Sequence, residues 1–209
     1  MNVAILSESE SDEAGVRILA EAVLKRSLEV LPKKLRAPTR GWTGMFDLLP
    51  AVFSALHWNP VADGLICVID SDDSTPHTEA HEAAGYSDSQ CRHCRLHQRI
   101  QQLRASLRPR TGQPLLVAIG LAVPAIEAWY LHGIDIHSTE SHFQRESPRA
   151  LTTVRRQLKI SAYGSVAVPQ RVLTAKAIDH CTRIATDIGS LQQAFPSGFG
   201  TFARSLRLW

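Results

Sequence analysis

The sequence predicts an α/β fold: a mostly parallel four-stranded sheet flanked by helices, followed by a helical C-terminal extension. Two observations predict this class. Short apolar runs of strand length alternate with longer segments whose apolar residues recur at helical spacing, and two of the runs end directly in carboxylates. We expect one α/β domain over residues 1–135 and a packed helical extension over residues 136–209.

The elements of this fold follow from periodicity along the chain. Apolar runs that predict buried strands lie at 3–6, 28–38, 64–70 and 114–120. Of these, the run at 28–38 is limited by Pro32, which cannot donate a hydrogen bond within a sheet. Apolar residues at helical spacing predict helices at 13–26, 45–57, 91–108, 124–133, 148–160 and 171–194. The polar stretch 138–150 is expected to be largely a loop.

The composition excludes several classes of protein. Hydrophobic residues make up 44% and charged residues 21% of the 209-residue chain, which is ordinary for a globular protein. No apolar run approaches the ~20 residues that cross a bilayer, and MNVAILSESES lacks the basic start and cleavage site of a signal peptide. The four unevenly spaced cysteines do not form a secreted disulfide framework. We therefore expect a cytoplasmic protein with no membrane partner.

Carboxylates follow two of the predicted strands. Glu8 comes shortly after the strand at 3–6, and Asp70, Asp72 and Asp73 lie at the end of the strand at 64–70. The carboxyl ends of parallel strands meet at one edge of a sheet, where ligands gather, and residues two apart in an extended chain face the same side. We expect Glu8, Asp70 and Asp72 to bind Mg²⁺ or Mn²⁺ for phosphoryl chemistry, with Asp73 as a supporting acid.

The other acids of ILSESESDE (5–13) belong to the start of the first predicted helix. We expect Asp12 and Glu13 to cap this helix, because negative charge is favoured at the positive end of the helix dipole. Glu10 is a candidate supporting acid. Glu8 is therefore the residue of this stretch that is predicted to take part in chemistry.

These motifs resemble those of Toprim domains. ILSESESDEAGVRIL resembles the first Toprim motif, with Ser9 where glycine is usual, and CVIDSDD resembles the second motif, Asp-x-Asp after a strand. The resemblance covers about residues 3–120 and implies a Toprim-like fold. It implies that Glu8 acts as a general acid or base or helps to hold metal, and that Asp70 and Asp72 hold the metal.

A further segment, VPAIEAWYLHG (123–133), looks like the segment after the last strand of standalone, RloB-like Toprim proteins from bacterial defence neighbourhoods. That likeness implies that Glu127 is a supporting acid; otherwise Glu127 faces solvent on a packed helix. The resemblance as a whole implies an Mg²⁺-dependent nuclease that cleaves nucleic-acid phosphodiesters in an antiphage system. Two alternatives stay open: a non-catalytic metal-binding adaptor or sensor for nucleic acid or a partner ATPase, and a nucleotide phosphohydrolase.

A second metal site is predicted in the insertion at 74–98. Two histidines four residues apart are followed by a Cys-x-x-Cys pair, which together offer four zinc ligands: His77, His81, Cys91 and Cys94. Such a set leaves no open position, so the predicted zinc is structural. His97 or His93 could replace one ligand. The alternatives are that the cysteines are small packing residues, with exposed histidines, or that His77 belongs to the Mg²⁺ site.

The predicted helix at 91–108 is strongly basic. Residues 91–110 carry six arginines and no acid, although the net charge of the chain is only +3. Arg92, Arg95 and Arg99 share one helical face, and Arg104 and Arg108 extend the positive stretch. Arginine pairs bidentately with phosphate, so we expect this helix to guide a DNA or RNA backbone towards the metal site. The alternative is a solvated face with ion pairs to acids at 79–88.

Overall fold

The computed structural model describes residues 1–32 and 41–209 and has the predicted α/β architecture. Its strands are β1 (Asn2–Leu6), β2 (Glu29–Val30), β3 (Gly64–Asp70) and β4 (Leu116–Ala122). They form one four-stranded sheet in the order β2-β1-β3-β4, and all neighbours are parallel. Because β1 and β3 are adjacent, the acids that follow them are brought to the same edge of the sheet.

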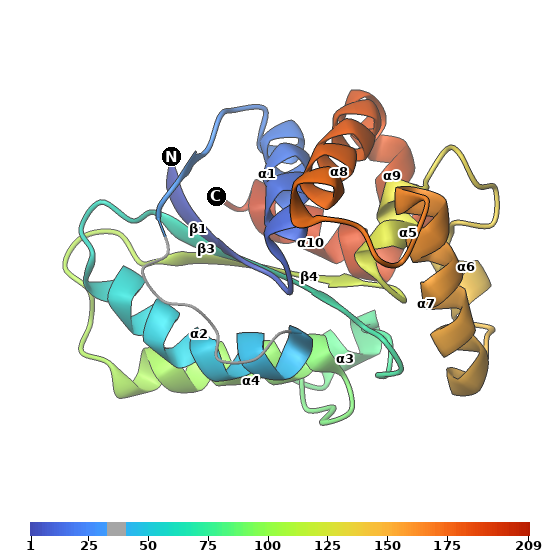
Figure 1. Ribbon diagram of the computed structural model, residues 1–209. Helices are drawn as coiled ribbons and strands as arrows, with labels where there is room; N and C mark the ends of the chain where they lie inside the picture. The colour runs from blue at the N-terminus through green and yellow to red at the C-terminus, as the bar shows by residue number, and fades with distance from the viewer. Residues whose placement is uncertain (33–40) are drawn as a thin grey trace.

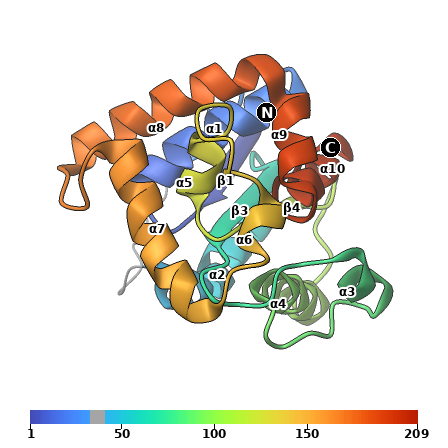
Figure 2. The same ribbon diagram turned by 90° about the vertical axis from the view of Figure 1, so that its right-hand side faces the viewer.

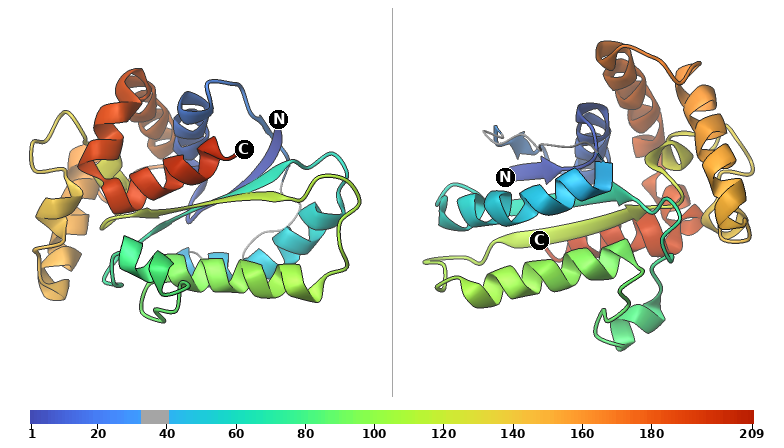
Figure 3. Two further views of the ribbon diagram at one scale, coloured as in Figure 1. Left: turned by 180° about the vertical axis from the view of Figure 1, so that it is seen from behind. Right: turned by 60° about the horizontal axis from the view of Figure 1, so that its bottom comes forward.

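Helices cover both faces of the sheet (Figure 1). One face carries α2 (Gly41–Trp58) and α4 (Arg92–Ser106), and the other carries α1 (Glu10–Leu24) and α10 (Thr201–Arg207). On this second side, α8 (Gln170–Ile184) packs against α1. Figure 3 shows the same two layers from behind. The remaining helices are α3 (Glu79–Ala83), α5 (Ile126–Tyr130), α6 (Glu140–Phe143), α7 (Pro148–Tyr163) and α9 (Ile188–Ala194). Of these, α5 and α7 lie beyond the carboxyl ends of the strands (Figure 2).

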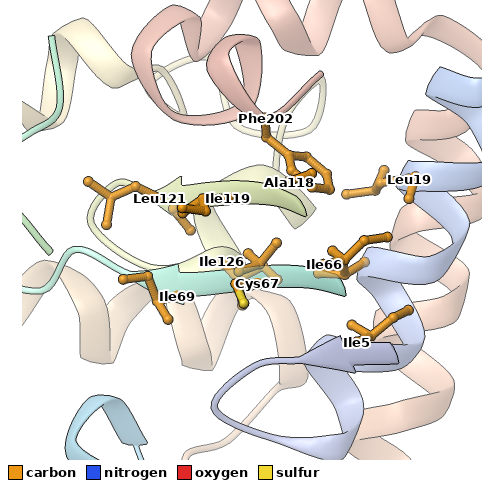
Figure 4. Packing of buried hydrophobic residues seen from close by; sticks show 14 of the residues in the cluster. Ile5, Leu19, Ile66, Cys67, Ile69, Ala118, Ile119, Leu121, Ile126 and Phe202 are labelled. Carbon is orange, nitrogen blue, oxygen red and sulfur yellow. The ribbon is translucent and has the colours of Figure 1, made fainter. Parts of the chain in front are cut away.

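The sheet owes its stability to side chains that alternate between its two faces. Figure 4 shows Leu19 of α1 and Phe202 of α10 against the face that Ile66 presents, while Cys67 and Ile69 point the other way. Every residue of β3 except Asp70 is buried. Because Phe202 is fully buried in this same core, the helices after residue 135 complete one layer over the sheet.

One glycine marks a close approach between this helical layer and the sheet. Gly198 precedes α10, and a β-carbon placed on it would lie 2.4 Å from the carbonyl oxygen of Leu121 in β4. Backbone atoms cannot yield as a flexible side chain can, so only glycine fits here. Glu140 fixes the same turn, because its carboxylate accepts hydrogen bonds from the backbone N–H groups of Ser197 and Gly198 at 3.0 and 3.1 Å.

The element bounds differ from the prediction in several places. The first helix begins at Glu10 and its N-cap is Ser9, whose hydroxyl accepts a hydrogen bond from the Asp12 N–H at 3.2 Å. The prediction that Asp12 caps this helix is therefore wrong. Of the strand expected at 28–38, only β2 forms within the described residues, and positions 33–38 lie outside them. The expected helix at 171–194 is interrupted by a 3₁₀ turn at Ala185–Asp187, and the expected loop at 138–150 contains α6.

No helix in the described ranges is both long enough and apolar enough to span a bilayer.

Candidate functional site

Carboxylates from distant parts of the sequence converge at the carboxyl edge of the sheet. Glu8 lies just beyond β1, and its Oε1 accepts a hydrogen bond from the backbone N–H of Asp70 at 3.2 Å. Asp70 ends β3, and its Oδ1 accepts the backbone N–H of Ile126 at 2.9 Å, which ties it to the helix that carries Glu127. Asp72 follows in the loop after β3 in a left-handed conformation, with a φ of 53°. These four acids, together with Asp12, are called the acid cluster below.

Burial makes ionisation unfavourable for four acids of the cluster: Glu8, Asp12, Asp70 and Glu127. Burial, with the charges of Glu127 and Glu8, raises the pKa of Asp70 well above its ordinary value. Burial and the neighbouring Asp72 likewise raise the pKa of Glu8. Burial raises the pKa of Asp12 to about 6 and that of Glu127 to about 7. Because burial is the largest cause of each of these shifts, a cation bound among the four carboxylates would favour their ionised forms.

One carboxylate oxygen of Glu127 is unpaired within this cluster. Its side chain is only 4% exposed, and its Oε2 is buried without a hydrogen-bond partner among the described residues. A buried, unpaired carboxylate oxygen is costly unless another group satisfies it. The Oε1 atom lies 4.0 Å from the ammonium nitrogen of Lys159, which satisfies only one side of the carboxylate. A cation bound beside Asp70 and Glu127 would satisfy the other.

Cationic side chains surround the acid cluster. Arg92, at the start of α4, donates hydrogen bonds to the Asp70 carbonyl oxygen at 2.8 Å and to Asp72 Oδ2 at 2.7 Å, and its nitrogen lies 3.9 Å from Glu8 Oε1. From the opposite side, Arg155 of α7 pairs with Asp72. Lys159 lies one helical turn further along the same face of α7. Guanidinium groups at this rim are suited to bind phosphate beside a metal.

The sequence did not place three residues at this site: Asp12, and Arg155 and Lys159, whose pattern indicates only a basic area in the C-terminal extension. Asp12 was interpreted as a helix cap, and α7 lies in the extension far from the acids in sequence. The i, i+4 spacing of Arg155 and Lys159 indicates a shared cationic face, but only the tertiary fold brings that face to the acids. The expected supporting acids Glu10 and Asp73 are both exposed, and neither makes an ion pair with another described residue.

The second predicted site is a compact cluster of four ligand groups. One nitrogen or sulfur atom from each of His77, His81, Cys91 and Cys94 lies within 4.8 Å of the others, so this cluster can hold a metal ion. The His77 Nδ1 atom is 3.7 Å from Cys91 Sγ and 3.6 Å from Cys94 Sγ, and His81 Nδ1 is 3.6 Å from Cys94 Sγ. Tetrahedral zinc, with bonds of about 2.3 Å to sulfur and 2.0 Å to nitrogen, requires such separations of about 3.6 Å.

The outer nitrogens of both histidines face carboxylates. His77 Nε2 lies 3.4 Å from Glu82, and His81 Nε2 lies 3.3 Å from Asp88. Histidines that bind metals commonly donate their second ring N–H to a carboxylate, which fixes the orientation of the ring. Asp88 also accepts the backbone N–H groups of Gln90 and Cys91, at 2.7 and 3.3 Å. The surroundings of the cluster are therefore those of a metal site.

No protein-family model, curated protein or solved structure matches this chain. The two clusters and their surroundings are therefore the features from which a function can be inferred.

The two clusters are joined at the N-terminus of α4. Cys91 belongs to the His/Cys cluster, and the next residue, Arg92, contacts Asp70 and Asp72 in the acid cluster. His97, the expected substitute ligand, lies outside the four-atom group and stacks on Tyr86 with 3.5 Å between ring centroids.

The basic face of α4 is only partly available to an external phosphate. Arg92 is engaged by the acids, and the Arg95 guanidinium lies over the rings of Trp42 and Phe46 of α2, 5.1 Å from each centroid. The other three arginines of the expected phosphate-binding set are not held by acids in the described part of the chain. Arg99 donates a hydrogen bond to Gln102 at 3.5 Å, Arg104 donates one to a backbone carbonyl oxygen at 2.9 Å, and Arg108 is exposed. Arg92 is therefore held by the acid cluster, whereas Arg95 rests on the α2 rings and remains exposed.

Proposed function

We propose that this protein is an Mg²⁺- or Mn²⁺-dependent phosphodiesterase that cleaves nucleic acid at the acid cluster. The observation that carries the proposal is the convergence of Glu8, Asp70 and Glu127 on one sheet edge, with raised pKa values and a buried, unpartnered Glu127 oxygen. Magnesium favours few carboxylates, retained water and substrate phosphate oxygens. The resemblance of ILSESESDE and CVIDSDD to Toprim motifs supports the same reaction.

The residues of the cluster have different roles in the proposed reaction. Glu8, Asp70 and Asp72 would hold the cation, with the unpartnered Glu127 oxygen beside it, and the cation would neutralise charge at the reacting phosphate. Glu8 is also placed to move a proton, because its raised pKa brings it nearer to neutral pH. Arg92 and Arg155 pair with Asp72, and their guanidinium groups would also be able to contact phosphate oxygens of a bound substrate. Antiphage defence, as the Toprim resemblance implies, is the biological setting that we propose for this reaction.

Cleavage assays with matched variants test the proposal. Plasmid, single-stranded DNA and RNA are incubated with the protein in Mg²⁺, in Mn²⁺ and with both withheld. We expect metal-dependent cleavage that Glu8→Gln and Asp70→Asn abolish and that the exposed control Glu29→Gln retains. Equal cleavage by wild type and both cluster variants would show that the activity comes from elsewhere.

A second candidate function is supported by the way in which Asp72 is held. Two guanidinium groups already neutralise this acid. Asp72 can therefore be part of a structural ion-pair network in a binding protein, without any role in catalysis. In that case the protein is a non-catalytic adaptor for nucleic acid or a partner ATPase. Nucleic-acid or ATPase binding that survives Asp70→Asn, without cleavage of any substrate, would favour the adaptor over the enzyme.

For the second cluster we infer that His77, His81, Cys91 and Cys94 bind structural zinc. Two imidazoles and two thiolates form a complete tetrahedral set, and softer sulfur ligands favour zinc over magnesium. A zinc ion here would fasten the segment before α3 to the start of α4, and through Cys91 would fix the backbone that carries Arg92. Elemental analysis should find about one zinc per folded chain. A Cys94→Ser variant that folds and retains the same zinc content would contradict the assignment.

A further inference from the structure

A cavity lies at the open edge of the sheet, away from the acid cluster. It has a volume of about 530 Å³ and is bounded by α4, the edge strand β4 and α10. In Figure 2, β4 lies between α10 and α4 at this edge. Small-molecule sites commonly have volumes of about 300–1,000 Å³, so the cavity can hold one ligand of the size of a nucleotide. The acid-cluster residues are not part of its lining.

One part of the cavity is apolar and aromatic. Ile100 of α4 and Val117 and Ile119 of β4 line it, and Ile100 and Ile119 are 3% and 5% exposed. Tyr86 and His97 stack on each other beside these residues. Flat side chains next to branched apolar ones form a surface on which a planar ring can stack. This part of the cavity favours an aromatic ligand group.

His93 adds a buried polar group to the lining. His93 is 3% exposed and stacks on His77 with 3.9 Å between ring centroids, and among the described residues its ring nitrogens have no hydrogen-bond partner other than the Ile119 backbone. A buried polar atom without a partner is unfavourable, and a ligand with polar ring edges would provide one. The His93 ring therefore points to a ligand that carries both a flat ring and hydrogen-bonding atoms.

Another part of the cavity is cationic. Arg104 reaches it from α4, and Arg204 and Arg207 reach it from α10. The single carboxylate in the lining, Glu82, lies 3.6 Å from Arg204. In residues 1–32 and 41–209, Arg104 and Arg207 make no ion pair; each donates one hydrogen bond to a neutral oxygen, at 2.9 and 2.7 Å. Since a guanidinium carries five donors, both can still bind an anion.

We propose that this cavity binds a nucleoside phosphate, with the base stacked on the Tyr86–His97 wall and the phosphate held by Arg104 and Arg207. The ligand is either a free mononucleotide or the terminal nucleotide of a strand, because both present the same base and phosphate. The proposal does not depend on the acid cluster. A nucleotide bound here would contact α4, whose first turn carries Arg92 against the acids.

Binding of AMP tests the proposal directly. Isothermal titration calorimetry is performed on the zinc-containing protein without added Mg²⁺, so that cleavage does not contribute. We expect saturable binding of AMP that Arg104→Gln and Arg207→Gln each weaken about tenfold, the loss of a charged hydrogen bond. The exposed α1 residue Arg17 provides a matched control, and Arg17→Gln should bind as wild type does. Glu8→Gln should also bind normally, which separates this site from the acid cluster.

The two sources of the ligand are distinguished by further titrations. A short oligonucleotide with a 5′-phosphate that binds more tightly than AMP, and more tightly than its 5′-hydroxyl form, would identify a strand end as the occupant. AMP binding that equals or exceeds oligonucleotide binding would identify a free nucleotide. Inorganic phosphate should bind more weakly than AMP, and Tyr86→Leu should remove that advantage.

Three results would overturn the proposal. The first is the absence of saturable binding of both AMP and the 5′-phosphorylated oligonucleotide up to about 1 mM. The second is equal affinity of AMP for the Arg104→Gln, Arg207→Gln and Arg17→Gln proteins. The third is phosphate binding as tight as AMP binding. Circular dichroism and zinc content establish that each variant is folded.

Discussion

Glu127→Gln should stabilise the metal-free protein at alkaline pH, although it replaces a residue of the candidate site. Glu127 is 4% exposed, and burial raises its pKa from 4.5 to about 7. Because the folded-state pKa lies above the unfolded value, the folded protein binds this proton more tightly. Its contribution to the free energy of unfolding is therefore fully present below about pH 4.5 and is lost as the pH rises towards 7.

The size of the effect follows from this pKa. A tenfold change in proton affinity is worth about 1.4 kcal/mol, so a displacement from 4.5 to about 7 corresponds to about 3 kcal/mol at pH 8. Glutamine has the shape of the protonated acid and cannot ionise. The variant should therefore match wild type near pH 4.5 and exceed its free energy of unfolding by about 3 kcal/mol at pH 8.

Urea unfolding at both pH values, with and without Mg²⁺, measures the effect. Saturating Mg²⁺ should stabilise wild type at pH 8 and should stabilise Glu127→Gln less, since the variant offers the cation a neutral amide. The exposed Asp179 of α8 serves as a control, and Asp179→Asn should behave as wild type does throughout. Equal destabilisation of Glu127→Gln at both pH values would refute the reasoning, because the buried charge would then carry no cost.

Three further predictions concern the surroundings of the two clusters. Cys94→Ser should lose zinc and lower the thermal midpoint, measured by calorimetry alongside elemental analysis; an unchanged midpoint in a zinc-free protein would contradict a structural role. Arg155→Gln should tighten Mg²⁺ binding several-fold in a calorimetric titration, because Asp72 loses a competing cation, and weaker binding would show that Arg155 positions the acid instead. Gly198→Ala should lower the free energy of unfolding by more than about 2 kcal/mol, because its β-carbon would meet the Leu121 carbonyl oxygen at 2.4 Å; a neutral effect would contradict that close approach.

Local pattern predicted the framework of the protein well. The run GLICVID predicted a buried strand ending at Asp70, and β3 spans those residues. The fold class was confirmed, because alternation of apolar strands and helices leads to a parallel sheet. The His/Cys cluster was also accessible from spacing, since His77 and His81 are four residues apart and Cys91 and Cys94 share a Cys-x-x-Cys motif, although of the two histidines only His81 lies in a helix.

What the sequence did not reveal depends on tertiary contacts. Asp12 has the signature of a helix cap, yet Ser9 takes that position and the Asp12 carboxylate joins the acid cluster. Arg155 and Lys159 lie in the C-terminal extension, and only the packing of α7 beyond the strand ends brings them to Asp72 and Glu127. Arg95 has the pattern of a phosphate-binding residue, and its exposed side chain lies with the guanidinium over the rings of Trp42 and Phe46 of the neighbouring helix, a contact that its spacing does not reveal. The periodicity of a sequence does not specify contacts between residues that are far apart along the chain.

The most direct test of the acid cluster is a crystal structure determined after soaking in MnCl₂, with anomalous data that distinguish manganese from zinc. We expect a manganese peak bonded to the carboxylates of Glu8, Asp70 and Asp72 at about 2.1 Å. A crystal that shows metal between His77, His81, Cys91 and Cys94, and none at the acids, would contradict the proposed reaction.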